Sequence, residues 1–175
     1  KTNFDLDILE PERMNLDILY EDDYLVAIDK PAGLIMHPGA GQSNGTLASG
    51  LKYHFNKLSN SSGLLRPGIV HRLDKETSGV VLIAKDNNMH SMLSSQFEKR
   101  EIKKEYFGIT WGKWIEKEGE ITDNLKRKRS DPTSYQINGN GREAITLYKV
   151  IKSGFYTNEV IFCPRTGRTH QIRVH

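Results

Sequence analysis

Apolar and polar positions alternate over short stretches near the start of the chain, and this pattern predicts a β-hairpin. Residues 18–20 and 24–28 are rich in aromatic and large aliphatic side chains, and they flank the acidic segment 21–23. A Lys-Pro-Ala-Gly turn at residues 30–33 marks the end of the second strand. Residues 1–16 show no sustained periodicity, so we interpret them as a linker.

The next apolar pattern has the spacing of an amphipathic helix. After a glycine-rich loop over residues 38–45, Thr46 can cap a helix that runs to about residue 57. One face of this helix is apolar and consists of Leu47, Leu51 and Phe55. A second polar loop follows at residues 59–63.

An apolar run over residues 79–85 predicts a buried strand, which a second helix follows. Asp86 and Asn87 can cap this helix, and we expect it to run to about residue 99. Four apolar side chains form a stripe that we expect to pack in the core: Met89, Met92, Leu93 and Phe97.

The rest of the chain is dominated by β-rich segments. We expect strands at residues 102–111, 120–122, 135–137, 144–151 and 156–162, with a Gly-Asn-Gly turn at residues 139–141. Because these strands come in a run and do not alternate strictly with helices, the pattern favours an α+β fold. We expect a mixed, largely antiparallel β-sheet with flanking helices and loops.

Length and composition indicate a globular protein of one domain. The chain has 175 residues, of which 37% are hydrophobic and 27% are charged. No apolar run approaches the roughly 18–20 residues that a membrane span needs, so we expect no membrane association. The chain starts at Lys1 without an apolar leader, and the single Cys163 cannot form an intramolecular disulfide. We therefore expect a cytoplasmic monomer.

Charge is distributed unevenly, although the formal net charge is only +3. Residues 1–23 carry a local excess of acidic side chains, whereas the segment 163–175 contains three arginines and no acid. A basic run consists of Lys126, Arg127, Lys128 and Arg129. Taken alone, such a run fits a solvated loop as well as it fits a loop that contacts phosphates.

The segment 71–79 carries the clearest candidate chemistry. It places Asp74 between the cations Arg72 and Lys75, just before a Thr-Ser-Gly bend that enters the apolar run. A carboxylate that must stay ionised in a closed pocket needs such cations, because desolvation raises its pKa. The alternative is a surface or capping aspartate that pairs locally with Arg72 or Lys75.

This nonapeptide resembles the signature of pseudouridine synthases, in the branch that acts on ribosomal and transfer RNA with an HRLD-type motif. Residues 18–33 resemble the first hairpin of that family, and residues 165–175 resemble its third motif. The resemblance covers residues 17–175, which we expect to be the catalytic domain, incomplete at the C-terminus. It also implies a small RNA-binding domain before residue 1.

The resemblance implies three catalytic residues. Asp74 would act on the ribose, either as a nucleophile at the sugar carbon or as a base toward the 2′ proton. Tyr106 would stack on the target base, and Arg173 would pair with Asp74. The alternatives are ordinary strand packing for Tyr106 and an exposed arginine for Arg173. If Tyr106 faces the pocket, alternation should turn Phe107 toward the core.

Other residues of the signature would have supporting roles. Arg72 would enter the RNA helix or contact phosphates near a flipped nucleotide. His71 would orient the motif or touch RNA, and an ordinary structural histidine fits equally well. Thr77 and Ser78 would hydrogen-bond the turn, and Gly79 would let the turn enter the strand without a clash.

Four further contacts to the substrate follow from the resemblance. Arg168 is a candidate for RNA phosphates or for the pocket, with an exposed arginine as the alternative. Lys30 and His37 flank the first loop and are candidate substrate contacts. Beside this signature, the residues Lys126 to Arg129 are better explained as a phosphate-contacting loop than as a solvated one.

The predicted function is the isomerisation of uridine to pseudouridine in structured RNA, with ribosomal RNA favoured over transfer RNA. The six histidines are scattered and Cys163 stands alone, so we expect no metal and no cofactor. One alternative is a non-catalytic RNA-binding module on the same scaffold. Another is a glycosidase-like hydrolase that pairs Asp74 with a second carboxylate, of which Glu76 is the nearest.

Overall fold

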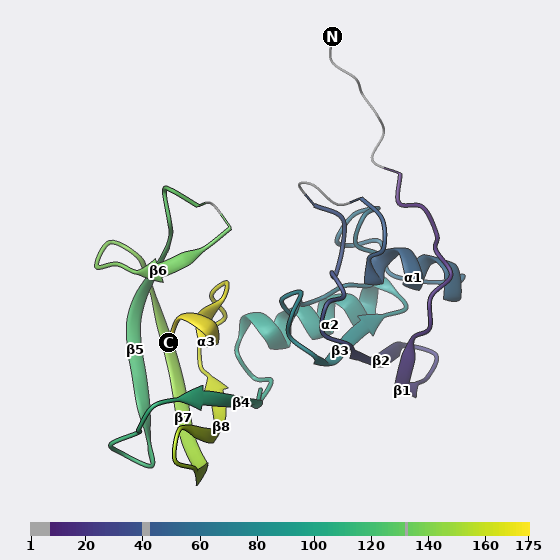
Figure 1. Cartoon of the computed structure of the whole chain (residues 1–175). Helices are drawn as coiled ribbons and strands as arrows, with labels where there is room; N and C mark the ends of the chain where they lie inside the picture. Colours follow the sequence, from purple (N-terminus) through teal and green to yellow (C-terminus); the bar gives the residue numbers. More distant parts are fainter. Residues whose placement is uncertain (1–7, 40–42, 132) are drawn as a thin grey trace. The chain divides into compact units, whose positions relative to one another are not determined.

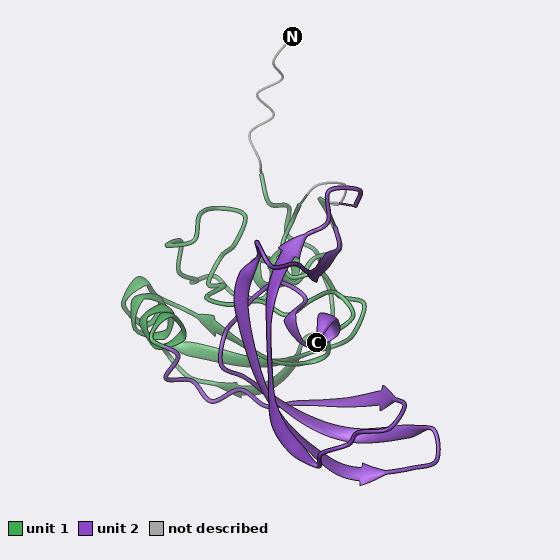
Figure 2. Ribbon diagram, turned by 90° about the vertical axis from the view of Figure 1, so that its left-hand side faces the viewer, with its two compact units in different colours: residues 1–99 green, residues 100–175 purple. Residues whose placement is uncertain are grey.

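The chain folds as two compact units, residues 1–99 and residues 100–175 (Figure 2). The structure is a computed structural model that describes residues 8–39, 43–131 and 133–175 (Figure 1). Part of the predicted linker (1–7) and part of the predicted glycine-rich loop (40–42) lie outside the described residues. Each unit has its own antiparallel sheet.

The sheet of the first unit has three strands in the order β1-β2-β3. The strands are β1 (Asp17–Glu21), β2 (Leu25–Lys30) and β3 (Gly79–Ala84). The predicted hairpin and the predicted buried strand are confirmed, and β3 pairs with β2 across a long sequence separation. This pairing brings the segment 71–78, which enters β3, close to the end of β2.

The turn between β1 and β2 is closed by a side chain. The carboxylate of Asp22 accepts hydrogen bonds from the backbone N–H groups of Tyr24 and Leu25, both at 2.8 Å. These two bonds, that from Leu25 most strongly, hold the pKa of Asp22 below its usual value. Asp22 therefore has a structural role in the hairpin.

The first helix begins where the sequence predicts it and ends slightly earlier. Helix α1 (Leu47–His54) is capped by Thr46, whose hydroxyl accepts a hydrogen bond from the N–H of Ser49 at 3.2 Å. The expected end near residue 57 is too late, because Phe55 already has an extended backbone.

The second helix also has the predicted cap but a different buried face. Helix α2 (Asn87–Glu98) is capped by Asp86, which accepts a hydrogen bond from the N–H of Met89 at 2.9 Å. Leu93 is buried, but Met92 is 59% exposed, so the prediction that Met92 packs in the core is wrong. The buried stripe includes His90 instead, one helical turn before Leu93.

The core of the first unit lies on one face of its sheet. Val26 and Ile28 of β2 pair with Ile83 and Val81 of β3, respectively, and all four side chains are buried. Helix α1 adds further buried side chains, which include Leu47, Ala48 and Leu51. The same core therefore supports the end of β2 and the start of β3.

The second unit is a five-stranded antiparallel sheet in the order β4-β8-β7-β5-β6 (Figure 1). Its strands are β4 (Tyr106–Trp111), β5 (Glu118–Arg127), β6 (Tyr135–Ile137), β7 (Arg142–Ser153) and β8 (Thr157–Pro164). A short helix, α3 (Gln171–Val174), follows, and the sequence pattern did not predict it.

The largest difference between a predicted and an observed strand is at β5, which extends beyond the predicted residues 120–122 at both ends. Its far end pairs with β6, where Lys126 lies opposite Gln136 and Arg127 opposite Tyr135. The prediction that the basic run is a loop is therefore wrong for its first two residues. Pairing with β6 extends β5 beyond Leu125, where its pairing with β7 ends, through charged residues that have little strand propensity of their own.

The exposed and the packed face of β4 are not the ones that alternation predicted. Phe107, Ile109 and Trp111 are 59%, 68% and 82% exposed, so the prediction that Phe107 turns toward the core is wrong. Tyr106 lies opposite Phe162 of β8, which is buried, so the packed face of this sheet is the face that carries Tyr106.

Within the described part of the chain, no helix has both the length and the apolar character that crossing a membrane requires.

Candidate active site

The segment that carries Asp74 is a tight turn between an isolated bridge at Ile69 and strand β3. Leu73 is buried and fixes the segment to the core, while Asp74 is half-buried. The N–H of Thr77 donates to the carbonyl of Asp74 at 3.1 Å and closes the turn. The turn is thus anchored through Leu73, and the next residue, Asp74, stays partly accessible to solvent.

Gly79 joins this turn to β3 in a backbone conformation that favours glycine, with φ of +128°. The nearest atom to an added Cβ would be a methyl group of Leu73 at 4.0 Å, which is an ordinary contact. The expected reason for the glycine, avoidance of a clash, is therefore wrong. Glycine is required here by the backbone angle.

His71 lies at the start of the turn and contacts two neighbouring elements. Its Nε2 accepts a hydrogen bond from the N–H of Leu82 at 2.9 Å, and its ring stacks on Phe97 with centroids 4.5 Å apart. These contacts connect the turn to β3 and to α2. They favour an orienting role for His71 over a contact with RNA.

Lys30 is fully buried at the end of β2, although lysine is rarely buried. Its ammonium group donates to the carbonyls of Pro31 and Leu34 at 2.8 Å and of Lys75 at 3.1 Å. Burial lowers the pKa of Lys30, and the nearby carboxylates of Glu76 and Asp74 oppose this shift. The structure thus connects Lys30 directly with the turn that carries Asp74.

His37 lies on the loop after β2 and is half-buried. Its Nδ1 donates to the carbonyl of Pro38 at 2.9 Å, which fixes the proton on that nitrogen. Burial lowers the pKa of His37, and the positive charges of Arg66 and Arg72 lower it further. The fold therefore brings Arg72 and His37 into one electropositive region of the first unit.

The remaining residues of the signature lie in the same segment, 71–78. Arg72 and Ser78 are exposed, and Thr77 is half-buried. Exposure of Arg72 leaves its guanidinium accessible to a phosphate, as the predicted RNA contact requires.

Tyr106 and Arg173 belong to the second unit, whereas Asp74 belongs to the first. Tyr106 begins β4 and is half-buried. Arg173 lies in α3, and its side chain is exposed.

Helix α3 is held by a buried glutamine that the sequence analysis missed. The Oε1 of Gln171 accepts from the Oγ1 of Thr166 at 2.8 Å and from the N–H of Arg168 at 2.9 Å. Its Nε2 donates at 2.9 Å to the carbonyl of Ile145 and to the Oγ1 of Thr146. Both ends of the amide are thus satisfied. The sequence pattern does not distinguish a buried glutamine from a surface one, because two of the partners of Gln171, Ile145 and Thr146, lie in β7, which is remote in sequence.

The turn before α3 has an unusual backbone at His170, with φ of +56°. The ring of His170 lies edge-on to Tyr135 of β6, with centroids 5.5 Å apart. Arg168 donates through Nε to the carbonyl of Glu143 at 2.8 Å, so part of its guanidinium is bound to β7. These contacts fix the third motif against the sheet from which it emerges.

The basic run lies at the end of β5 and in the connection to β6. Arg127 donates through Nε to the hydroxyl of Tyr135 at 3.4 Å and lies 5.7 Å from the centre of its ring. This hydrogen bond lowers the pKa of Tyr135. Lys128 is half-buried and Arg129 is exposed.

Asp131 binds the two residues that precede β6, Thr133 and Ser134. Its carboxylate accepts hydrogen bonds from the hydroxyls of Ser134 and Thr133 and from the N–H of Thr133, which lowers the pKa of Asp131 to about 2. Lys128, just before this connection, donates through its backbone N–H to the carbonyl of Ser134 at 2.9 Å.

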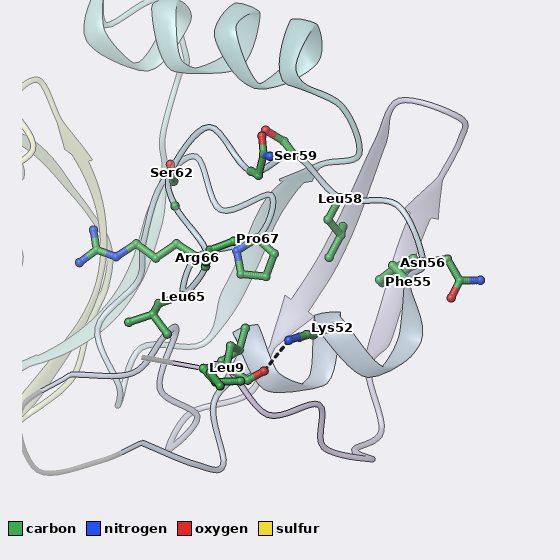
Figure 3. A pocket seen from close by; sticks show the side chains of 14 residues that line it. Leu9, Lys52, Phe55, Asn56, Leu58, Ser59, Ser62, Leu65, Arg66 and Pro67 are labelled. Carbon is green, nitrogen blue, oxygen red and sulfur yellow. Dashed lines mark hydrogen bonds between the residues drawn. The ribbon is translucent and has the colours of Figure 1, made fainter. Parts of the chain in front are cut away.

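A cavity of about 830 Å³ lies elsewhere in the first unit, between α1 and the loop that follows it (Figure 3). Its walls are mostly apolar and include Leu9, Phe55 and Leu65. Lys52 donates to the carbonyl of Leu9 at 2.7 Å at its edge (Figure 3). The predicted site residues do not line this cavity. Among residues 8–39, 43–131 and 133–175, no three or more His, Cys, Asp or Glu side chains gather as they would around a metal ion.

The chain is similar in sequence to known RNA pseudouridine synthases. It is 42% identical over 170 residues to an uncharacterized RNA pseudouridine synthase of Aquifex aeolicus, across 95% of this chain and 54% of that protein. It is also 42% identical over 165 residues to the ribosomal large subunit pseudouridine synthase D of Buchnera aphidicola, across 94% of this chain and 52% of that protein. The chain therefore spans about half the length of these curated relatives.

Solved structures support the same relationship and confirm the α+β fold. Human RNA pseudouridylate synthase domain containing 1 is 25% identical, with a TM-score of 0.74 over 95% of this chain and 66% of that one. Human RNA pseudouridylate synthase domain containing 4 is 30% identical, with a TM-score of 0.68 over 91% of this chain and 62% of that one. A family model described as RNA pseudouridylate synthase matches residues 24–175. The three ordered motifs, the fold and this match together show that the chain belongs to the RNA pseudouridylate synthase family.

Proposed function

We propose that the protein isomerises specific uridines to pseudouridine in structured RNA, with ribosomal RNA as the favoured substrate. The observation that carries this proposal is the anchored turn that presents Asp74, within a family match that spans residues 24–175. Ribosomal RNA is favoured because relatives that are 37–42% identical are named ribosomal large subunit pseudouridine synthase D. A ribosomal substrate also fits the expected cytoplasmic location.

The reaction rearranges one nucleotide without a net change in composition. The bond between N1 of uracil and C1′ of ribose breaks, the base rotates, and C5 forms a new bond to C1′. The hydrogen on C5 leaves as a proton, and N1 carries a hydrogen in the product. No electron is gained or lost, so the chemistry needs only groups that hold the base and manage protons.

Asp74 is proposed to start the reaction, either by attack on C1′ or by removal of the 2′ proton. Both routes need an ionised carboxylate at the ribose. Arg173 is proposed to pair with this carboxylate, since guanidinium stays charged at neutral pH. Tyr106 is proposed to stack on the uracil and to accept the proton from C5.

RNA binding is proposed to rely on exposed cations. Arg72 lies two positions before Asp74 and is exposed, so it can reach the backbone beside an extruded nucleotide. Arg168 and the residues Lys126 to Arg129 supply further positive charge in the second unit. Ser78 and Thr77 would line the turn, and His37 remains a candidate substrate contact.

The direct test uses RNA that carries tritium at C5 of uridine and the full-length protein. Wild type should release tritium to water, and Asp74→Asn should abolish release while it still binds RNA. Glu76→Gln is the matched control, because Glu76 is an exposed carboxylate two residues away, and it should keep the wild-type rate. Bound RNA without release from the wild-type protein would support a binding module, and a free uracil product would support a hydrolase.

A further inference from the structure

We propose that Tyr135 is a positioning residue that holds the guanidinium group of Arg127 in place to bind a phosphate of the RNA backbone. This inference rests on the proposed function, and it assigns a defined phosphate site, next to the third motif, to one residue of the basic run. Tyr135 belongs to none of the three sequence motifs, and strand pairing brings it to this site.

Tyr135 of β6 and Arg127 of β5 lie directly opposite each other in an antiparallel pair. Directly opposed residues point to the same face of a sheet, with their Cβ atoms about 4.5–5.5 Å apart. Arg127 is exposed and Tyr135 is half-buried, so the pair borders the solvent. The register of the two strands therefore keeps the guanidinium group of Arg127 close to the phenol ring.

Two contacts fix the guanidinium group on Tyr135. The Nε of Arg127 donates to the hydroxyl of Tyr135 at 3.4 Å, and its Cζ lies over the ring, 5.7 Å from the centroid. The second distance is within the roughly 6 Å over which an aromatic ring attracts a cation. Tyr135 engages only the Nε–H donor, so it does not use the donors on the two terminal nitrogens. Those donors form the fork that binds phosphate oxygens in pairs.

The surroundings of this pair are electropositive. Among residues 8–39, 43–131 and 133–175, Arg127 forms no ion pair with a carboxylate. Arg142 begins β7 opposite Leu125, so alternation places it on the same face as Arg127, and it is exposed. The pKa of Tyr135 is lowered, first by the hydrogen bond from Arg127 and also by the charge of Arg142. An anion is therefore the ligand that fits this surface.

The same ring contacts the third motif, and this contact favours RNA as the anion. The ring of His170 lies edge-on to Tyr135, with centroids 5.5 Å apart, and α3 contacts β6 (Figure 1). The third motif also carries Arg168, which is proposed to bind RNA. A phosphate bound by Arg127 would thus lie beside a segment that the proposed function already places at the RNA.

The test is a double-mutant cycle of Tyr135→Leu and Arg127→Gln in the full-length protein. The probe is a transcript of large-subunit ribosomal RNA, and the readouts are its dissociation constant and the dependence of that constant on salt. Arg127→Gln should reduce the slope of log affinity against log salt by about 0.7–0.9, which weakens binding about five- to eightfold more at about 0.1 M salt than at about 1 M. Tyr135→Leu should weaken binding about three- to fivefold, because the fork keeps its charge but is no longer held.

The cycle separates positioning from direct contact. In the Arg127→Gln background, Tyr135→Leu should leave the affinity unchanged, because no guanidinium group is left to hold. A loss that persists in that background would overturn the proposal and make Tyr135 a direct contact that stacks on a base. An unchanged affinity and slope in folded Arg127→Gln would also overturn it and would favour an acidic protein as the partner of this surface.

Tyr135→Phe covers the case in which Tyr135→Leu does not fold. Phenylalanine keeps the ring and removes only the hydroxyl, so the loss of affinity should be smaller than with leucine, and a larger loss would overturn the role of the ring. Tyr156→Leu and Lys149→Gln are the matched controls, because both residues are exposed in the same unit. Lys149 lies about 23 Å along β7 from Arg142. Both controls should keep the wild-type affinity.

The rate of tritium release distinguishes this site from the chemistry. At saturating enzyme, the variants of Tyr135 and Arg127 should release tritium from C5 of uridine within about twofold of the wild-type rate, because both residues act on binding. A larger fall in that rate would overturn the assignment to binding. Coupling between the two residues in a protein whose wild type releases no tritium would preserve the phosphate site and refute the isomerase. Tritium release without that coupling would preserve the isomerase and refute the site.

Discussion

The Nε2 of His71 accepts a hydrogen bond from the backbone N–H of Leu82 at 2.9 Å. A nitrogen that accepts a hydrogen bond carries no proton, so the imidazole is neutral and its proton is on Nδ1. The same ring stacks on Phe97. The histidine of the signature thus connects the turn that carries Asp74 with both β3 and α2. Its position three residues before Asp74 makes it a structural anchor of the proposed catalytic carboxylate.

Substitution of His71 by phenylalanine should destabilise the protein by about 1–3 kcal/mol. Phenylalanine can keep the stacking on Phe97, but it leaves the N–H of Leu82 without an acceptor, and an unsatisfied backbone donor costs about that much. Denaturant unfolding measures the change. Phe97→Leu is the companion variant, because it removes the stacking and keeps the hydrogen bond. A His71→Phe protein as stable as wild type would show that water replaces the imidazole.

Gly79→Ala should destabilise the protein by about 1–2 kcal/mol, because alanine is strained at the left-handed backbone angle of this residue. The space around the added methyl group is sufficient, so the cost comes from φ alone. Gly39→Ala is the matched control, since that position is open and lacks such an angle. Equal melting temperatures for the two variants would show that the turn relaxes when Gly79 is replaced.

Gln171→Met should lower both stability and the rate of tritium release. The substitution removes four hydrogen bonds that fix the third motif, and it leaves the buried hydroxyls of Thr166 and Thr146 without their amide partner. We expect a loss of about 1–3 kcal/mol in the free energy of unfolding. Gln136→Met, at an exposed position of β6, should change stability by less than about 0.5 kcal/mol. A smaller effect at Gln171 than at Gln136 would contradict the structure.

Stability should decrease as the pH falls below about 6.5, in part because of His90. Burial lowers the pKa of this histidine from its ordinary value of 6.5, so the folded state binds fewer protons than the unfolded state below that pH. The hydroxyl of Ser62 donates to the carbonyl of Ile69 and therefore accepts from Nε2 of His90. The stabilisation is complete above pH 6.5 and is lost toward lower pH.

His90→Gln tests this pH dependence. Glutamine can still donate to Ser62, but it does not titrate. Denaturant unfolding at several pH values between about 5 and 7.5 should show a shallower loss of stability in acid than wild type shows. Equal slopes for both proteins would assign the acid sensitivity to other groups.

Charge reversal in the basic run should weaken RNA binding and flatten its dependence on salt. Each lost phosphate contact should reduce the slope of log affinity against log salt by about 0.7–0.9. Lys128→Glu and Arg129→Glu test the run, and Lys152→Glu is the control, since Lys152 pairs with Glu159 at 3.6 Å. The rate on fully bound RNA should stay unchanged. A slope equal to that of wild type would remove these residues from the RNA interface.

Local patterns were sufficient to predict most elements of the fold. The hairpin β1-β2, the caps Thr46 and Asp86, and strand β6 agree with the prediction, because each depends on residues that are neighbours in the sequence. The predictions failed at Met92, at Phe107 and along β5, where a partner strand or a packed face decides the outcome. Alternation predicts two faces, but it does not say which of them is covered.

The sequence by itself determined the family and the location of its motifs, since order and spacing along the chain are enough to recognise them. It did not determine the burial and the hydrogen bonds of Lys30 and Gln171, which only the tertiary structure revealed. Lys30 meets the carbonyl of Lys75 only because β2 pairs with β3, and Gln171 meets Ile145 only because the third motif folds back on β7. Whether a polar side chain is exposed or buried depends on its partners, and those partners are remote in sequence.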